Sequence, residues 1–212
     1  MGVDPAWLAE WAAAWAISRG KPAPVPVHDG FYLLDGRPQQ KARYIFPNLR
    51  EEVVTDMVQR IDEPIVYLKF CAPRDEVAAL LPEGWEIAAP GFLMTGDAEI
   101  LAAPGGLPDG YAGALSERDG VIALSVTTDE GEPAARGRLV PRGRLAAFDQ
   151  IETEEAHRRR GLGSAVMRML GREACRRGAE RGILVATPAA RALYRALGWE
   201  TLSDYTSAFR PR

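Results

Sequence analysis

The densest chemical signal in the sequence is a basic, glycine-rich stretch from His157 to Ser164, which reads His-Arg-Arg-Arg-Gly-Leu-Gly-Ser. It follows a predicted strand and opens a predicted helix at 161–177. The first turn of a helix presents backbone N–H groups without intrahelical partners and carries a partial positive charge. Arginines are unfavourable at that end, by roughly a few tenths of a kcal/mol each, unless an anion compensates them. The stretch therefore predicts a site for a phosphate or pyrophosphate.

Two glycines in this stretch support the same interpretation. A Cβ at Gly161 or Gly163 would hold phosphate oxygens away from the backbone amides. The pattern lacks the third glycine of a dinucleotide-binding fingerprint and the Gly-Lys-Ser/Thr of a P-loop. The alternative interpretation is a helix start that happens to be basic, and three consecutive arginines favour the anion site over it.

The elements that must position this loop can be predicted from apolar periodicity and turn residues. In the second half, strands are expected at 121–127, 135–139, 145–153 and 182–187, a helix at 188–197, and a final strand or strand pair at 199–209. The first half is expected to hold a helix at 5–20, a hairpin of 31–34 and 42–46, a helix at 49–61, a strand at 64–70, a helix at 73–81 and an extended segment at 85–95. The Gly- and Pro-rich residues 102–113 separate the halves.

Two further patterns concern the first half. Trp7, Trp11 and Trp15 recur every four residues, which predicts a helix face that docks onto the rest of the chain. The order strand, proline, helix, Gly-Trp-Glu occurs twice, with the triplets at 84–86 and 198–200. This order favours a duplicated unit, although α/β proteins also reuse it. Only the second copy has the arginine- and glycine-rich loop, so only that copy is expected to hold a phosphate.

Composition excludes several classes of function. The chain has 212 residues and a formal net charge of −3, which argues against a protein that coats nucleic acid. Cys71 and Cys175 show no disulfide or metal-ligand spacing, and no apolar stretch is long enough to span a membrane. We therefore expect a cytoplasmic protein with no metal site and with neither nucleic acid nor membrane as a partner.

Two motifs give the chain a family resemblance. Arg158 to Gly163 fits the pattern Gln/Arg-x-x-Gly-x-Gly/Ala, and Leu193 to Trp199 fits Leu-Tyr-x-x-Leu-Gly-Phe/Trp. Together, and in this order, they resemble the GNAT acetyltransferase superfamily over about residues 115 to 210. The resemblance implies an α/β fold with a mixed, mostly antiparallel central sheet flanked by helices, and an N-terminal α/β half that is a candidate degenerate repeat. The expected domains are an amphipathic helix with a Pro-rich connector at 1–26, an N-terminal half at 27–105, and an acetyl-CoA-binding domain at 106–212.

The resemblance also implies roles for individual residues, with acetyl-CoA as co-substrate. The loop amides would hold the pyrophosphate, and the preceding strand would pair with the pantetheine arm and splay from the strand at 182–187. Tyr194 would protonate the departing thiolate, and the family's frequent asparagine is Thr187 here. The implied cofactor-binding residues are Ile151, Glu152, Thr153, Arg158, Arg159, Arg160, Gly161, Leu162, Gly163, Ser164, Thr187 and Tyr194.

The general base is left open by the sequence. An amine must lose a proton to attack a thioester, and Asp149 and Glu152 lie on the strand before the loop. In a regular strand these two point to opposite faces, so only one would face the cleft unless a bulge intervenes. Both also fit solvated strand charges, and His157 fits a contact to the cofactor better than a base. For Tyr194 the alternative is a core aromatic without a chemical role.

The sequence thus predicts transfer of an acetyl group to the primary amine of a small molecule by direct attack. The alternatives are a protein or peptide N-acetyltransferase, a non-catalytic acyl-CoA-binding module, and a protein that binds another nucleotide. The expected partner is a small-molecule amine acceptor. A homodimer is the alternative in which the tryptophan face packs on a second copy.

Overall fold

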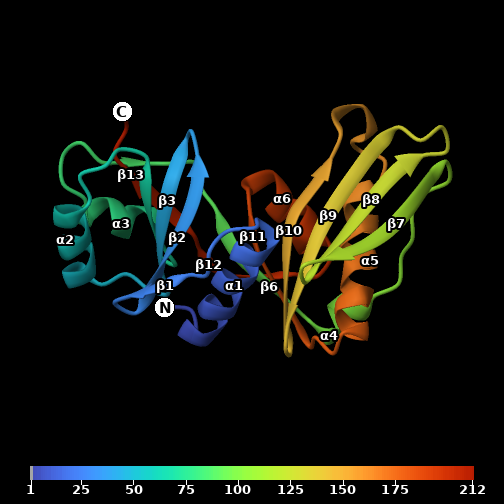
Figure 1. Ribbon diagram of the computed structural model, residues 1–212, viewed down its shortest axis with the longest axis horizontal. Helices are drawn as coiled ribbons and strands as arrows, with labels where there is room; N and C mark the ends of the chain where they lie inside the picture. The colour runs from blue at the N-terminus through green and yellow to red at the C-terminus, as the bar shows by residue number, and fades with distance from the viewer. Residues whose placement is uncertain (1) are drawn as a thin grey trace. The chain divides into compact units, whose positions relative to one another are not determined.

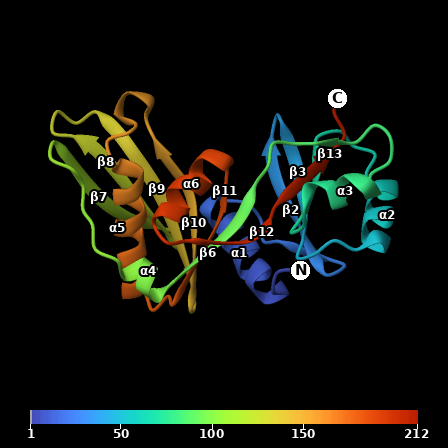
Figure 2. The same ribbon diagram turned by 180° about the vertical axis from the view of Figure 1, so that it is seen from behind.

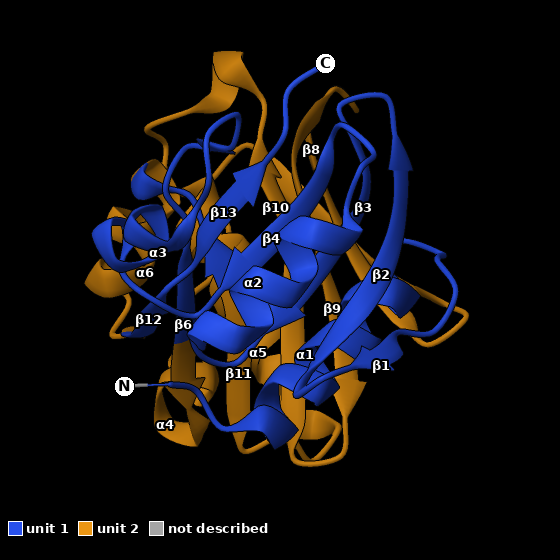
Figure 3. Ribbon diagram, turned by 90° about the vertical axis from the view of Figure 1, so that its left-hand side faces the viewer, with its two compact units in different colours: residues 1–94, 185–188, 201–212 blue, residues 95–184, 189–200 orange. Residues whose placement is uncertain are grey.

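A computed structural model describes residues 2–212, which form two compact units (Figure 3). Unit 1 contains the chain up to Met94, together with Val185–Pro188 and Thr201–Arg212, and unit 2 contains Thr95–Leu184 and Ala189–Glu200. The element labels are those of Figures 1 and 2. Across residues 2–212, no helix combines the length and the apolar character needed to cross a membrane.

Unit 1 is built on a six-stranded sheet with the order β1-β2-β3-β4-β13-β5. The neighbouring strands β3 and β4 are parallel, and α2 connects them. They pair over the whole of β4, from Ala42 opposite Val66 to Phe46 opposite Phe70. The elements are α1 (Pro5–Ser18), β1 (Val25–Val27), β2 (Gly30–Arg37), β3 (Gln40–Phe46), α2 (Glu51–Arg60), β4 (Val66–Phe70), α3 (Arg74–Leu80), β5 (Glu86–Ile87) and β13 (Thr206–Phe209).

Helix α1 docks within unit 1 through its tryptophans. Asp4 accepts a hydrogen bond from the Ala6 amide at 2.8 Å, and a proline in the first turn completes the start of the helix. Trp11 meets the ring of Tyr205 edge to face at 5.8 Å, and the Arg43 guanidinium lies 4.1 Å from the centre of the Trp15 ring. The docking role predicted for this face is therefore confirmed at Trp11 and Trp15.

The second sheet has seven strands in the order β12-β6-β11-β10-β9-β8-β7. Helix α5 packs on one face of it. A Cβ at Gly137 in β9 would lie only 2.7 Å from Val166 and 2.8 Å from Leu170, so glycine allows the helix to approach. The elements are β6 (Phe92–Asp97), α4 (Ala98–Ala102), β7 (Tyr111–Arg118), β8 (Val121–Thr128), β9 (Pro133–Arg142), β10 (Leu145–Thr153), the 3-10 turn η1 (Glu155–His157), α5 (Leu162–Arg176), β11 (Arg181–Ala186), α6 (Pro188–Ala196) and β12 (Glu200–Asp204).

The two sheets follow one plan. Read from their corresponding ends, β5-β13-β4-β3-β2-β1 matches β12-β6-β11-β10-β9-β8, and β7 is an addition. In both, two parallel strands are joined by a helix. This correspondence supports the duplicated unit that the Gly-Trp-Glu triplets suggested, and it confirms the predicted fold class of mostly antiparallel sheets with helices. The domain boundaries at 26/27 and 105/106 are functional divisions and stay a prediction.

Three local predictions need correction. Residues 102–113 were expected to separate the halves, with the first strand of the second half at 121, yet α4 ends at Ala102 and a further strand, β7, begins at Tyr111. Strand β7 is exposed along almost its whole length, so it lacks the alternation that would reveal it. The first hairpin strand was expected to end at residue 34, but β2 continues to Arg37. The Asp35 carboxylate is buried in ion pairs with Arg37 and Arg43, which keeps this segment in the sheet. The final strand pair is β12 and β13, which belong to different sheets.

Candidate functional site

The loop between β10 and α5 has the backbone of an anion site. Arg159 and Gly161 both adopt left-handed conformations, with φ of 63° and 82°. A left-handed arginine is strained by roughly 1 kcal/mol or more, and such strain tends to persist at functional sites. Helix α5 begins at Leu162 with no side chain capping it, and its first internal bond runs from the Ala165 amide to the Gly161 carbonyl at 3.0 Å. The preceding amides are therefore available to an anion.

The two glycines of the loop are required for different reasons. A Cβ at Gly161 would have no atom within 4 Å, so the positive φ, and not crowding, requires glycine at this position. A Cβ at Gly163 would lie 2.9 Å from Leu193 in α6 and 3.9 Å from the Thr153 hydroxyl. Gly163 thus allows α6 to approach α5, a packing role that the sequence analysis had not assigned to it.

Tyr111, which the sequence analysis missed, ties the loop to the edge strand β7. Its hydroxyl lies 3.0 Å from His157 Nδ1 and accepts a hydrogen bond from Arg160 Nη1 at 3.1 Å. A guanidinium can only donate, so the phenol oxygen accepts from Arg160, and the direction of its hydrogen bond with His157 Nδ1 depends on the imidazole tautomer. The order Arg160 to Tyr111 to His157 therefore holds two loop side chains in place. No local sequence signal links residues this far apart.

Strands β10 and β11 part at the point where a thioester would enter. Their parallel pairing covers only Leu145–Ala147 opposite Arg181–Ile183, although β10 continues to Thr153 and β11 to Ala186. Beyond Ala147, the edge of β10 that faces β11 is left without this partner. The predicted splay is therefore present, and Ile151, Glu152 and Thr153 lie on the diverging part of β10.

A bulge in β10 brings the two candidate bases onto one face. The register shifts between Asp149 and Glu152, which stand opposite Arg138 and Arg136. Two arginines two positions apart on β9 share a face, so their partners on β10 share it as well. The expectation of opposite faces for a regular strand therefore does not hold, because Gln150 takes the extra position with φ of 52°.

The two carboxylates differ in their surroundings. Glu152 is half exposed and accepts a hydrogen bond from Arg136 Nε at 3.0 Å, which neutralises it. The charge of Asp149 acts on Tyr194. A hollow of about 240 Å³ is lined by Arg136 and Arg138 of β9, which stand opposite the two carboxylates, and by Ser125 and Gln150. Glu152 is better suited to a structural pair, and Asp149, whose charge reaches Tyr194, is the remaining candidate for a base.

Tyr194 is a buried side chain of α6, with an exposed fraction of 5%. Burial, with a smaller contribution from the Asp149 carboxylate, raises the pKa of its hydroxyl to about 12. The phenol therefore keeps its proton throughout the neutral range. An ordinary tyrosine has a pKa near 10, so burial makes Tyr194 a weaker acid than a free phenol, and its protonated hydroxyl can donate a hydrogen bond to a leaving thiolate.

Of the remaining predicted residues, Leu162 is buried, with an exposed fraction of 1%, so only its backbone amide could meet a ligand, whereas the arginines are accessible. Arg158, Arg159 and Arg160 are exposed, and Arg158 donates weakly to the Thr153 carbonyl at 3.4 Å. Thr187 is exposed and directly precedes α6, within the segment assigned to unit 1. Loop amides, a left-handed glycine and exposed guanidinium groups suit a diphosphate, so the residues of unit 2 fit the pyrophosphate of a coenzyme A thioester.

Comparison with known proteins agrees with this geometry. Residues 120–201 match the family described as the acetyltransferase (GNAT) domain. This match confirms the resemblance drawn from the two motifs for that segment, and the family consists of acyltransferases that use an acyl-CoA as co-substrate. No curated protein matches the sequence significantly.

Solved structures resemble the chain over almost its whole length. A GCN5-related N-acetyltransferase from Kribbella flavida superposes with a TM-score of 0.69 at 17% identity and covers 100% of this chain and 97% of its own. An acetyltransferase of the GNAT family from Novosphingobium aromaticivorans gives 0.60 at 18% identity, with 99% of each chain covered. A tandem GNAT protein from the clavulanic acid biosynthesis pathway gives 0.59 at 14% identity and covers 96% and 93%. At these identities the likeness shows a shared fold.

Proposed function

We propose that this protein transfers an acetyl group from acetyl-CoA to the primary amine of a small molecule by direct attack. The observation that carries the proposal is the parting of β10 and β11 beside the uncapped start of α5. The start of α5 would hold the diphosphate, and the gap between β10 and β11 would admit the acyl end of acetyl-CoA. The two free thiols, Cys71 and Cys175, are consistent with the cytoplasm as the compartment.

The proposed reaction needs three groups from the chain: a base, a donor to the oxyanion and an acid. The bound thioester supplies the activated acetyl group, and a new C–N bond forms as the C–S bond breaks. Asp149 is the proposed acceptor of the ammonium proton, directly or through water. A backbone amide on the free edge of β10 would donate to the developing oxyanion. Tyr194 would give a proton to the sulfur as it leaves, and the second proton that the nitrogen loses on becoming the amide would restore the Tyr194 hydroxyl.

The nature of the acceptor separates this proposal from its alternatives. A structural neighbour from the clavulanic acid biosynthesis pathway supports a small molecule over a protein acceptor. A protein N-acetyltransferase would instead prefer peptides, and a non-catalytic module would bind acetyl-CoA without releasing thiol. Thiol release from acetyl-CoA across amines, amino acids, polyamines and peptides distinguishes all three. Saturable turnover with a small amine is expected, and binding without release across the whole panel would contradict the proposal.

The proton donor can be tested separately. Tyr194→Phe removes only the hydroxyl from a side chain that packs against Trp199, with ring centres 6.2 Å apart, so the fold should persist. Loss of a positioned acid typically costs about 10²-fold or more in rate. We expect a fall of that order in kcat with little change in acetyl-CoA affinity. Thr206→Val, which removes a buried hydroxyl bonded to the Ala72 carbonyl in unit 1, is the control. An unchanged kcat in Tyr194→Phe would remove this residue as the acid.

A further inference from the structure

A wide concave surface in unit 1 lies outside the proposed catalytic machinery. It is a groove of about 880 Å³ formed by β1, β2 and β3, the segment that follows α2, and the C-terminal Arg212. Its floor carries Tyr32 and Tyr44, which stand opposite each other in the sheet with ring centres 5.1 Å apart. This volume falls within the range of about 300–1,000 Å³ that is typical of small-molecule sites.

The groove exists because unit 1 lacks a covering segment that unit 2 has. On the helix face of the second sheet, Leu124 and Leu139 are fully buried. Helix α4 and the chain after it pack there, with Arg172 bonded to the Gly105 carbonyl at 2.7 Å and Leu107 against β7. In unit 1 the helix before the sheet, α1, packs against Arg43 instead. Since Arg43 and Tyr44 are adjacent in β3, α1 lies on the opposite face, and Tyr32 and Tyr44 stay only half-buried against the core of unit 1.

The uncovered face is apolar. Val25 and Leu34 are 54% and 42% exposed, and both line the groove. They are two of the three large hydrophobic side chains that are exposed among residues 2–212. Leu34 stands opposite Ala42 and Val25 stands opposite Tyr32, so one strand face presents all of them. A patch of this kind, rimmed by polar groups, marks a site where something binds.

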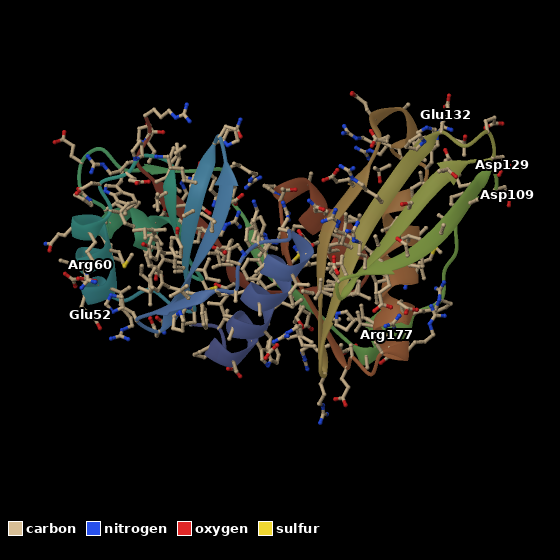
Figure 4. The ribbon with its side chains drawn as sticks, viewed as in Figure 1. Glu52, Arg60, Asp109, Asp129, Glu132 and Arg177 are labelled. Atoms are coloured by element: carbon tan, nitrogen blue, oxygen red, sulfur yellow. The ribbon has the colours of Figure 1, made fainter. Side chains whose placement is uncertain are left out.

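The rim of the groove carries several cationic side chains. Arg37, Lys41, Arg60 and Arg212 line it together with Asp62 and Glu63, and three of the cations are paired, Arg37 with Asp35, Lys41 with Glu63 and Arg60 with Asp56. The charge of Arg60 reaches the Tyr44 hydroxyl, where it opposes the rise in pKa that burial causes. Arg60 donates to Asp56 through Nε alone, at 2.7 Å, which leaves its two terminal nitrogens free to donate. It lies at the C-terminal end of α2 (Figure 4).

We propose that this groove binds a small organic anion whose apolar body lies on Tyr32, Tyr44 and Leu34 while its carboxylate meets Arg60. The tyrosine hydroxyls add donors at the same place. The site is separate from the acetyl-transfer chemistry assigned to unit 2, so its occupant is an additional ligand. An apolar pocket with a few convergent polar groups, among them a guanidinium with open terminal donors, selects for this class of molecule.

Calorimetric titration of the full-length protein with decanoate, decanol and decylamine tests the proposal. Decanoate is expected to bind saturably at one site per chain, more tightly than decanol and much more tightly than decylamine. Leu34→Asp should weaken decanoate binding about tenfold or more by placing a like charge in the groove. The matched control is Leu115→Asp on β7, because Leu115 has the same exposed fraction of 42% but lies in unit 2. Both leucines are exposed, so both variants should fold.

A second pair of variants tests the charge. Arg60→Gln removes the charge and keeps a polar, though shorter, side chain. It should narrow the preference for decanoate over decanol, whereas Arg118→Gln at the end of β7 should leave that preference unchanged. Preferred binding of decylamine, equal binding of decanoate and decanol, or equal loss in Leu34→Asp and Leu115→Asp would each overturn the proposal. The absence of saturable binding by decanoate below its micelle concentration would overturn it as well.

Discussion

At the scale of single residues, the site depends on side chains that the sequence did not single out. The residue types of the loop, arginine and glycine, are enough to predict an anion site, because neighbouring residues in the sequence form it. The contact of Tyr111 with His157 and Arg160 cannot be predicted in this way, since only the fold brings these residues together. Likewise, the pairing of Asp149 and Glu152 on one face depends on a bulge at Gln150 that no residue type in β10 reveals.

The role of Tyr111 can be measured through acetyl-CoA affinity. Tyr111→Phe removes the oxygen that links Arg160 to His157 and leaves the ring, which meets the imidazole edge to face at 5.7 Å. A hydrogen bond typically contributes about 0.5–1.5 kcal/mol, so KM for acetyl-CoA should rise roughly two- to tenfold. The kcat value should stay the same, because Tyr111 holds the loop and does not touch the reacting atoms. Tyr67→Phe in unit 1, where the ring stacks on Phe209, is the control and should leave KM unchanged.

Lys69 is a buried cation, and its burial should lower the free energy of unfolding to an extent that depends on pH. Its Nζ donates to the Ser207 hydroxyl at 2.8 Å, and burial lowers its pKa from 10.5 to about 7. Between these values the unfolded chain binds more protons than the folded one, so stability from this group rises as pH increases from about 7 towards 10.5. Below pH 7 the full penalty is present.

Replacing this lysine should therefore stabilise the protein most at low pH. Urea unfolding of Lys69→Met against the unaltered protein is expected to show the largest gain near pH 6 and a steadily smaller one up to pH 10. Lys41→Met, at a half-exposed position that pairs with Glu63 at 3.3 Å, should show little change with pH. A gain for Lys69→Met that is constant across this range would mean that Lys69 stays charged in the folded state.

At the scale of elements, helix α5 is where the fold and the proposed function meet. Its two ends carry left-handed glycines of almost the same geometry, Gly161 with φ of 82° and Gly178 with φ of 84°. Neither has a heavy atom within 4 Å of a built Cβ. A side chain at either position meets the same backbone strain, of about 1 kcal/mol or more.

This symmetry provides a matched test of the anion site. Gly161→Val and Gly178→Val should lose similar stability by thermal unfolding, because each forces a β-branched residue into a left-handed conformation. Only Gly161→Val should also abolish binding of acetyl-CoA, since that glycine precedes the free amides of the first turn. Acetyl-CoA should raise the melting temperature of Gly178→Val and leave that of Gly161→Val unchanged. Equal loss of binding in both variants would assign the effect to stability instead of to the loop.

At the scale of the whole molecule, the sequence predicts the class of fold and the position of the site better than it predicts how the chain is divided. Periodic apolar residues revealed most helices and strands, because they alternate between core and solvent. The pattern fails for β7, which is exposed on nearly every residue, and for β12 and β13, whose separation into two sheets depends on long-range pairing. The sequence gives only a weak signal of the duplication, whereas the matching strand order of the two sheets shows it clearly.

The duplication raises the question of how many acetyl-CoA molecules one chain binds, and three differences predict a single one. In unit 1 the parallel strands β3 and β4 stay paired along all of β4, so they offer no splay, whereas β10 and β11 part after Ala147. Helix α2 follows Arg50 in an extended conformation with no left-handed glycine. Its first turn holds Glu51 and Glu52, while the first turn of α5 has no acidic residue. Negative side chains at a helix start repel a diphosphate.

Calorimetric titration with acetyl-CoA, checked by native mass spectrometry, should therefore give one molecule per chain. Gly161→Val should reduce that number to zero, because unit 2 alone holds the site. Arg50→Ala, which removes the nearest guanidinium to the start of α2 and its bond to Glu52 at 2.8 Å, should leave the number at one. Binding of two acetyl-CoA molecules per chain would place a diphosphate at α2. So would binding of one molecule that is kept in Gly161→Val and lost in Arg50→Ala. Either result would contradict the assignment of acyl transfer to unit 2.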